Sequence, residues 1–138
     1  MAYYRRHYGG QTAKYNNIKT VVDGITFDSR REANRYCELK LLVKGGLISN
    51  LELQKKYVLI EAQYAPDEVK TLKNGKQKIV KGELLERSCV YKADFTYIDN
   101  ATGKTVVEDT KSIATRTPEY KIKKKLLLKL YGIHIVEI

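Results

Sequence analysis

The order of elements in the C-terminal third of the chain restricts the fold more than any other feature. Two extended runs, at 90–98 and 104–111, are joined by a glycine-containing turn, which predicts an antiparallel hairpin. A helix with a Thr117-Pro118 start follows, and 133–138 reads as a final strand. Because a helical crossover returns the chain in the same direction, the final strand is expected to lie parallel to its neighbour. The sequence therefore predicts a mixed sheet.

A second helix is predicted from 30 to 44. Ser29 and Glu32 match the capping-box pattern that opens a helix, and Gly45-Gly46 provides a left-handed stop. The apolar residues that recur at helical spacing are expected to form the buried faces of the two helices. They are Ala33, Tyr36, Cys37, Leu41 and Val43 or Lys40 in the first helix, and Ile122, Leu126, Leu127 and Leu130 in the second.

One strand and an irregular excursion lie between the first helix and the hairpin. The run at 51–61 has the β-branched and aromatic residues of a strand. Within 62–89, Asn74-Gly75 separates two short extended runs and predicts a type I′ hairpin turn. This basic excursion is a solvated hairpin, a flap that touches DNA or an arm of a dimer, and the sequence leaves the three open.

These elements predict a single α/β domain over 22–138 with an N-terminal arm at 1–21. The order is α-β-β-β-α-β, with a mixed central sheet and an inserted β-hairpin. A length of 138 residues fits one core. The arm is basic and tyrosine-rich with little periodicity. It is either a terminus without function or a segment whose charges meet phosphates and whose rings stack on bases.

The composition points to a polyanion as the partner. There are 26 Lys and Arg residues against 16 Asp and Glu residues, a formal net charge of +10. No apolar run has the length of a membrane span and the N-terminus does not resemble a signal peptide, so we expect no membrane association and a cytoplasmic location. Two distant Cys and two His argue against zinc ribbons and histidine-based hydrolases. Any chemistry is therefore expected to depend on carboxylates and lysines.

Asp94 and Asp109 stand at positions that the predicted hairpin brings together. If Asp99 pairs with Lys104, counting five residues back on each side sets Asp94 directly opposite Asp109. The two side chains would share one face of the sheet, with Cβ atoms about 5 Å apart. Like charges opposite each other destabilise a sheet, so a pair of this kind indicates a bound cation.

Lys111 shares the face of Asp109, because side chains alternate along a strand. Two carboxylates for a hard divalent ion, with an ammonium beside it, suit the hydrolysis of a phosphodiester. The metal lowers the pKa of a bound water, and the lysine orients the hydroxide or neutralises developing charge. A register slipped by one residue would place Glu108 opposite Asp94 instead, away from Lys111, and we prefer Asp109.

Asp94 followed by the Asp-x-Lys tripeptide at 109–111 resembles the signature of the PD-(D/E)xK nucleases, whose core has the α-β-β-β-α-β order. Other stretches resemble a small phage and prophage family, domain of unknown function 1064, which is grouped with these endonucleases. The resemblance covers roughly 22–138, with Ala93 in place of the signature's proline and Asp109 in place of glutamate. The stretches that carry it are 22–29 with Glu32, 51–54, 93–95, 107–111 and 117–121.

The resemblance implies a restriction-endonuclease-like core and a metal-dependent DNA endonuclease similar to Holliday-junction resolvases. Mg²⁺ is the expected cofactor, with Mn²⁺ as a substitute, and phage origin would place the protein in the host cytoplasm, in DNA recombination or replication. Asp94 and Asp109 would bind the metal and Lys111 would be the catalytic lysine. Glu32 would be a further catalytic carboxylate and metal ligand, although its capping position alone accounts for it equally well.

Basic side chains on the two helices supply the expected nucleic-acid surface. We expect contacts with backbone and shape, because the chain has no zinc finger and no clear helix-turn-helix pair. The expected partner is branched or duplex DNA, and a homodimer would supply the two sites that symmetric cutting of two strands requires. The basic residues are Arg30, Arg31 and Arg35 in the first helix and Lys121, Lys124, Lys125 and Lys129 in the second.

Two alternatives remain from the residues alone. A catalytically inactive nucleic-acid-binding accessory protein could use the same fold and the same basic surface. A partner such as an anionic membrane or an acidic protein would explain the charge, but it leaves Asp94, Asp109 and Lys111 without a role.

Overall fold

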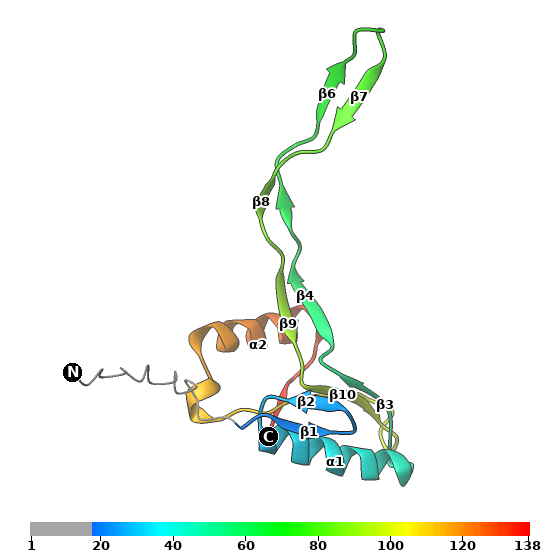
Figure 1. Ribbon diagram of the computed structural model, residues 1–138, viewed down its shortest axis with the longest axis vertical. Helices are drawn as coiled ribbons and strands as arrows, with labels where there is room; N and C mark the ends of the chain where they lie inside the picture. Colours follow the sequence, from blue (N-terminus) through cyan, green and yellow to red (C-terminus); the bar gives the residue numbers. More distant parts are fainter. Residues whose placement is uncertain (1–17) are drawn as a thin grey trace, which may run out of the picture.

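The computed structural model describes residues 18–138, which form an α/β domain with a protruding arm (Figure 1). The central sheet contains β3 (Ile48–Leu53), β10 (Phe95–Asp99), β11 (Thr105–Asp109) and β12 (Val136–Glu137). Its order is β12-β11-β10-β3, with β12 parallel to β11 and the other pairs antiparallel. The predicted α/β class and mixed sheet are therefore confirmed.

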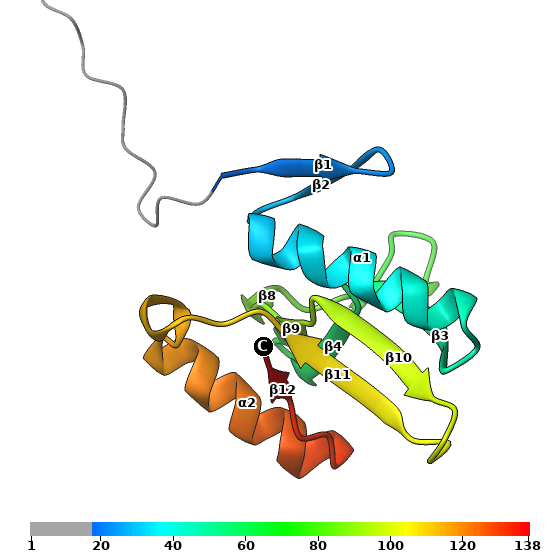
Figure 2. The ribbon, with the colours of Figure 1, turned by 90° about the horizontal axis from the view of Figure 1, so that it is seen from below.

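Helix α1 (Arg30–Lys44) and helix α2 (Pro118–Tyr131) cover opposite faces of this sheet (Figure 2). Helix α1 begins where the Ser29 hydroxyl accepts a hydrogen bond from the Glu32 amide at 3.2 Å. Helix α2 begins after its N-cap Thr117, as predicted. A short 3₁₀ helix, η1 (Ile113–Thr115), links β11 to α2.

Each helix packs on its own hydrophobic cluster. Leu39 of α1 is fully buried in one cluster with Phe95 of β10, and Leu127 of α2 is fully buried in the other with Val107 of β11. Burial of each such leucine stabilises the fold by roughly 1.5–3 kcal/mol. The two clusters hold opposite faces of the sheet, so residues that alternate along β11 face different helices.

The predicted helix faces are wrong at several positions. Ala33 and Leu127 are buried as expected, whereas Leu41 is 70% and Ile122 is 60% exposed. The buried stripe of α1 includes Glu32, because the helix turns polar side chains as well as apolar ones toward the sheet. The other residues that were expected to be buried and are exposed are Cys37, Lys40, Val43 and Leu130.

Each of the two long strands predicted at 51–61 and 90–98 is divided in two. The first continues from β3 into β4 (Lys56–Ile60), and the second consists of β9 (Cys89–Lys92) and β10. The breaks between β3 and β4 and between β9 and β10 face each other, since the Gln54 backbone amide donates to the Asp94 backbone carbonyl at 3.1 Å. Strands β4 and β9 leave the sheet together here and pair with each other.

The arm continues beyond β4 and β9 as a two-stranded ribbon. Strand β5 (Gln63–Tyr64) pairs with β8 (Leu84–Glu86), and β6 (Glu68–Thr71) pairs with β7 (Gln77–Val80). The predicted type I′ turn is wrong, because it needs positive φ at two residues and only Gly75 of this loop has it, at +80°. The ribbon is closed by a longer loop with its glycine in the left-handed conformation.

A small hairpin lies against α1 on the side away from the sheet (Figure 2). It consists of β1 (Thr20–Val22) and β2 (Ile25–Phe27), and the Phe27 and Tyr36 rings are 5.0 Å apart. Strand β1 begins inside the segment expected to be the N-terminal arm, whose residues 1–17 lie outside the described part. No helix within residues 18–138 is long and apolar enough to cross a membrane.

Candidate functional site

The hairpin of β10 and β11 has the predicted register. Phe95 pairs with Glu108, and the Asp99 amide donates to the Lys104 carbonyl at 3.0 Å. Extended by one position, this register sets Asp94 opposite Asp109. The Asp94 carboxylate accepts a hydrogen bond from the Thr110 amide at 2.8 Å, which fixes it at the end of β11. The structure therefore brings the two aspartates together at the point where β9 leaves the sheet.

Asp109 is buried, with only 3% of its surface exposed. The Tyr91 hydroxyl donates to its Oδ2 at 2.7 Å, and the Lys111 ammonium lies 3.2 Å from the same oxygen. Burial, a hydrogen bond with Asp94 and the negative charge of Asp94 raise the pKa of Asp109 to about 7. Near neutral pH the Asp109 carboxyl therefore holds a proton about as readily as it releases one.

Lys111 is held on the α2 face, next to Asp109. Its ammonium lies 4.4 Å from the centre of the Tyr120 ring, a cation–π contact with the first turn of α2. Its backbone is fixed as well, because the Lys111 amide donates to the Ile138 carbonyl at 3.1 Å. The side chain is mostly buried, so the charge is presented from a defined position.

Glu32 reaches the aspartates through Gln54. The side-chain amide nitrogen of Gln54 lies 3.2 Å from Glu32 Oε1 and 3.4 Å from Asp94 Oδ1. Burial and the charges of Asp94 and Asp28 raise the pKa of Glu32 to about 7. Only the Ser29 half of the expected capping box is present, since Ser29 caps the Glu32 backbone amide while the Glu32 carboxylate accepts a hydrogen bond from Gln54.

Glu108 lies on the opposite face, under α1. The Arg35 guanidinium donates to both of its carboxylate oxygens, at 2.9 and 2.6 Å, and the Tyr97 hydroxyl donates at 2.6 Å. The slipped register that would set Glu108 opposite Asp94 is absent from the described hairpin. Arg35 is also paired with the exposed Glu38 at 2.7 Å, so its charge is matched by two carboxylates of the same chain.

The other arginines of α1 lie at its exposed first turn. Arg30 and Arg31 are both exposed, and Arg31 donates to the Lys111 carbonyl at 3.2 Å. This bond ties the start of α1 to the strand end that carries Lys111. Arg31 therefore lies near Lys111, whereas Arg35 is engaged by Glu108 and Glu38.

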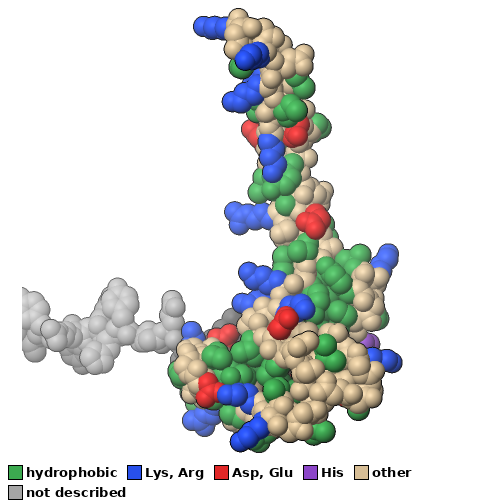
Figure 3. All heavy atoms as spheres, turned by 90° about the vertical axis from the view of Figure 1, so that its right-hand side faces the viewer, with side chains coloured by type: hydrophobic (Ala, Val, Ile, Leu, Met, Phe, Trp, Pro, Cys, Tyr) green, Lys and Arg blue, Asp and Glu red, His purple; other side chains and the backbone are tan. Residues whose placement is uncertain are grey.

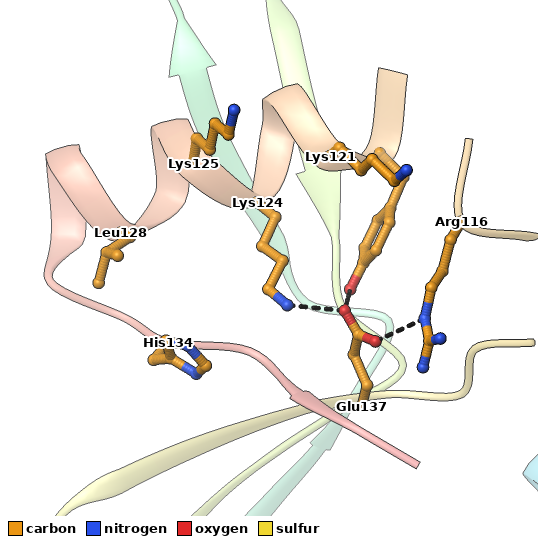
Figure 4. Close-up of a pocket in the computed structure, with 8 residues that line it drawn as sticks. Arg116, Lys121, Lys124, Lys125, Leu128, His134 and Glu137 are labelled. Atoms are coloured by element: carbon orange, nitrogen blue, oxygen red, sulfur yellow. Dashed lines mark hydrogen bonds and ion pairs between the residues drawn. The ribbon is translucent and has the colours of Figure 1, made fainter. Parts of the chain in front are cut away.

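A basic cavity of about 360 Å³ lies between α2 and the C-terminal segment (Figure 4). Glu137 stands in it and pairs with Lys124 and Arg116, each at 2.7 Å, while the Tyr120 hydroxyl donates at 3.0 Å. These contacts, Lys124 foremost, lower the pKa of Glu137. Lys121, Lys125 and His134 also line the cavity, whereas Lys129 is exposed outside it.

Two smaller cavities flank the aspartates. One, of about 210 Å³, contains Asp94, Glu32 and Gln54. The other, of about 290 Å³, contains Asp109 and Lys111, and Lys92 lines both. Each aspartate thus lines one of the two cavities.

The aspartate pair suits a hard cation, whereas a cluster of three carboxylates is not formed in the described residues. Among residues 18–138 no three His, Cys, Asp or Glu side chains are grouped closely enough to hold a metal. The expected ligand set of Asp94, Asp109 and Glu32 is therefore not assembled, because Gln54 separates Glu32 from Asp94. Mg²⁺ keeps several waters and is commonly bound by one or two carboxylates, which suits Asp94 and Asp109.

Sequence reasoning missed three side chains that surround the site. Tyr91 bonds Asp109, Tyr120 contacts Lys111, and Glu137 organises the basic cavity. The parallel pairing of Asp109 with Glu137 is the one signal that could have been used, because it places Glu137 on the neighbouring strand. The tyrosine hydroxyls have no signature in the sequence.

Comparisons with known proteins identify the family. Neither curated proteins nor solved structures gave a match. A family model described as a protein of unknown function (DUF1064) matches residues 12–134, which is most of the chain and includes every residue of the aspartate site. The chain therefore belongs to the DUF1064 family.

Proposed function

We propose that the protein is a metal-dependent endonuclease that hydrolyses phosphodiester bonds in DNA. One observation carries this proposal. Asp94 and Asp109 lie opposite each other in register at a bend of the sheet, with the Lys111 ammonium 3.2 Å from Asp109. A buried like-charge pair costs stability, and a bound divalent cation is the simplest reason for such a pair beside a lysine.

Asp94 and Asp109 would hold Mg²⁺, or Mn²⁺ in its place. The ion would supply a water of lowered pKa and would polarise the phosphoryl oxygen. The chain's own groups fix the geometry around it. The Thr110 amide orients Asp94 and the Tyr91 hydroxyl orients Asp109. Neither donor depends on a long flexible side chain, so the two carboxylates are preorganised.

Lys111 would meet the charge that develops on the phosphoryl oxygens. The cavity beside it, of about 290 Å³, also contains Asp109, so a phosphate that enters there contacts both groups. The Tyr120 ring under the ammonium limits its movement. A fixed ammonium costs little reorganisation during the reaction.

Glu32 would act through Gln54 and not as a metal ligand. Its carboxylate accepts from the Gln54 amide, whose nitrogen also contacts Asp94. Replacement of Glu32 by Gln would remove a raised-pKa carboxyl and leave a group that can still bond Gln54. We therefore assign Glu32 a positioning role, and its variant should change the pH profile more than the maximal rate.

The substrate proposed is branched or duplex DNA, recognised through its backbone. The basic cavity on α2 adjoins the aspartate site, because Tyr120 lines both cavities. Lys121 and Lys125 extend this surface along the helix. A homodimer would allow two strands to be cut, and a role in phage recombination or replication would fit such a substrate.

The test is incubation with labelled four-way junction, flap, single-stranded and linear duplex DNA, each with Mg²⁺ and with EDTA. We expect Mg²⁺-dependent cleavage, strongest on a branched substrate. Tight binding without cleavage of any substrate, with Mg²⁺ or Mn²⁺, would support the inactive accessory protein instead. Absence of both binding and cleavage would reject a nucleic-acid function.

A further inference from the structure

The arm extends far from the body and packs on nothing else. In residues 18–138, β5 and β8 pair only with each other, and so do β6 and β7 (Figure 1). At about 3.3 Å per residue, the twelve residues from 61 to 72 span about 40 Å. An isolated two-stranded ribbon is marginally stable in water, so the outer arm gains much from a partner.

The charges of the arm are divided along its length. The outer segment at 69–81 contains five lysines and no acidic residue. The inner segments, 61–68 and 82–88, contain five acidic residues and one arginine. Figure 3 shows Lys and Arg side chains on the outer arm and Asp and Glu side chains nearer the body. The five outer lysines are Lys70, Lys73, Lys76, Lys78 and Lys81.

The register of the outer hairpin places like charges together. Lys70 lies directly opposite Lys78, so both ammonium groups stand on one face. Like charges opposite each other destabilise an antiparallel pair unless an anion lies between them. None of the outer lysines forms an ion pair with another described residue. Five cations spread over a ribbon are met by an extended polyanion better than by a single small anion.

We propose that the outer segment at 69–81 binds the phosphate backbone of duplex DNA, at a tract separate from the one held at Asp94 and Asp109. The choice of DNA as the polyanion rests on the proposed function. The acidic inner arm repels phosphates, so one continuous tract cannot follow the whole arm. From Gln54, which lies beside Asp94, to Lys70 the chain covers sixteen residues, or about 53 Å, against 34–36 Å for one turn of duplex, so the two tracts lie about one and a half turns apart.

The experiment compares two triple variants of the full chain by their affinity for a duplex of about 30 base pairs in EDTA. The outer-arm variant carries Lys70→Gln, Lys73→Gln and Lys78→Gln. The control removes the same charge at three exposed lysines of the body, Lys19, Lys44 and Lys104. Thermal unfolding checks that the body remains folded in both variants.

Loss of three phosphate contacts lowers the magnitude of the salt slope by about 2.7. When salt rises from 50 to 200 mM, the affinity of both proteins for the duplex falls. The fold-decrease should be about 40 times smaller for the outer-arm variant than for the wild type. The control should keep nearly the wild-type slope. A duplex of about 12 base pairs is about 41 Å long and therefore too short for both tracts at about one and a half turns of separation, so it should bind the wild type and the outer-arm variant alike.

Equal slopes for the outer-arm variant and the control on the long duplex would overturn the proposal. A change in self-association, seen by sedimentation without a change in DNA affinity, would show that the arm contacts a second copy and would also overturn it. Because binding is measured without metal, the outcome is separate from cleavage. A protein that binds through its arm and cuts no DNA keeps this inference and loses the nuclease proposal.

Discussion

Glu108 and Asp109 are adjacent on one strand, equally buried, and opposite in their electrostatics. Their exposed fractions are 2% and 3%. Glu108 is matched by the two-pronged guanidinium of Arg35 and by the Tyr97 hydroxyl. Asp109 faces a second carboxylate, and the one cation near it, among residues 18–138, is Lys111. Burial alone therefore does not distinguish a carboxylate matched by a cation from one that faces a second carboxylate.

The two environments have different consequences. A buried ion pair with every oxygen bonded holds its residues in one arrangement, and it is costly to break. A buried carboxylate beside another is destabilised until it binds a proton or a cation. The raised pKa of Asp109 has this cause. Strand alternation places the first environment under α1 and the second under α2.

The largest effect is expected from Asp109→Asn. Removal of this carboxylate should lower Mg²⁺-dependent cleavage by about 1,000-fold or more, the upper end for loss of one preorganised electrostatic group. Affinity for DNA in EDTA should stay the same or rise, because a negative charge that faces phosphate is lost. Single-turnover cleavage and filter binding would measure the two effects. Near-normal cleavage would remove Asp109 from the site.

The matched change, Glu108→Gln, should act on stability. It leaves the Arg35 guanidinium without its buried partner, and breaking such a pair costs about 3–5 kcal/mol. Urea unfolding would measure this loss. The fraction that remains folded should still cleave DNA, since Glu108 faces away from Lys111. Loss of cleavage at normal stability would mean that the roles of the two residues are reversed.

A smaller effect is expected from Lys111→Arg. Arginine keeps the charge but cannot place a compact ammonium 3.2 Å from Asp109, so cleavage should fall about 100-fold while DNA affinity is kept. Lys123→Arg is the control, because Lys123 lines the same cavity and pairs with Glu119 at 3.0 Å. An equal loss of cleavage in both variants would show that the cavity tolerates no additional arginine, and it would contradict a specific role for the Lys111 ammonium.

Local signals in the sequence were sufficient for the helix ends and for the carboxylate register. The caps at Ser29 and Thr117 depend on neighbouring residues, and the hairpin register depends on one turn. Such features are set within a few residues, so they can be counted along the chain. The parallel final strand followed from the same logic, because a crossover helix leaves few alternatives.

Features that depend on distant partners could not be predicted. The bend at Gln54 and Asp94 arises where two strands exchange partners, and an uninterrupted strand pattern conceals it. The ion pair of Arg35 with Glu108 joins residues that are 73 positions apart. The separation of Glu32 from Asp94 by Gln54 likewise depends on tertiary packing, so the resemblance to a three-carboxylate site did not reveal it.

The effect that is smallest per step of the measurement, and the one that tests the aspartate pair without substrate, is the change in stability per pH unit. The pKa of Asp109 is raised from its ordinary 3.8 to about 7 in the folded protein. Between these values the folded state holds a proton that the unfolded state has released. Stability should therefore fall as pH rises from about 4 to 7, with a slope of up to about 1.4 kcal/mol per pH unit for one proton.

Asp109→Asn should remove the part of this slope that Asp109 contributes, whereas Glu61→Gln, which changes an exposed carboxylate of the arm, should keep the slope unchanged. Glu32, whose pKa is also raised to about 7, contributes in the same direction, so Glu32→Gln should flatten the slope in part. On the proposed function Mg²⁺ would take the place of the proton, and at pH 8 it should stabilise the wild type by about 2.7 kcal/mol when present at 100 times its dissociation constant. Asp109→Asn should show no such gain. Stabilisation of both proteins by Mg²⁺ would place the cation elsewhere, and stabilisation of neither would leave the pair as a proton-sharing element without metal.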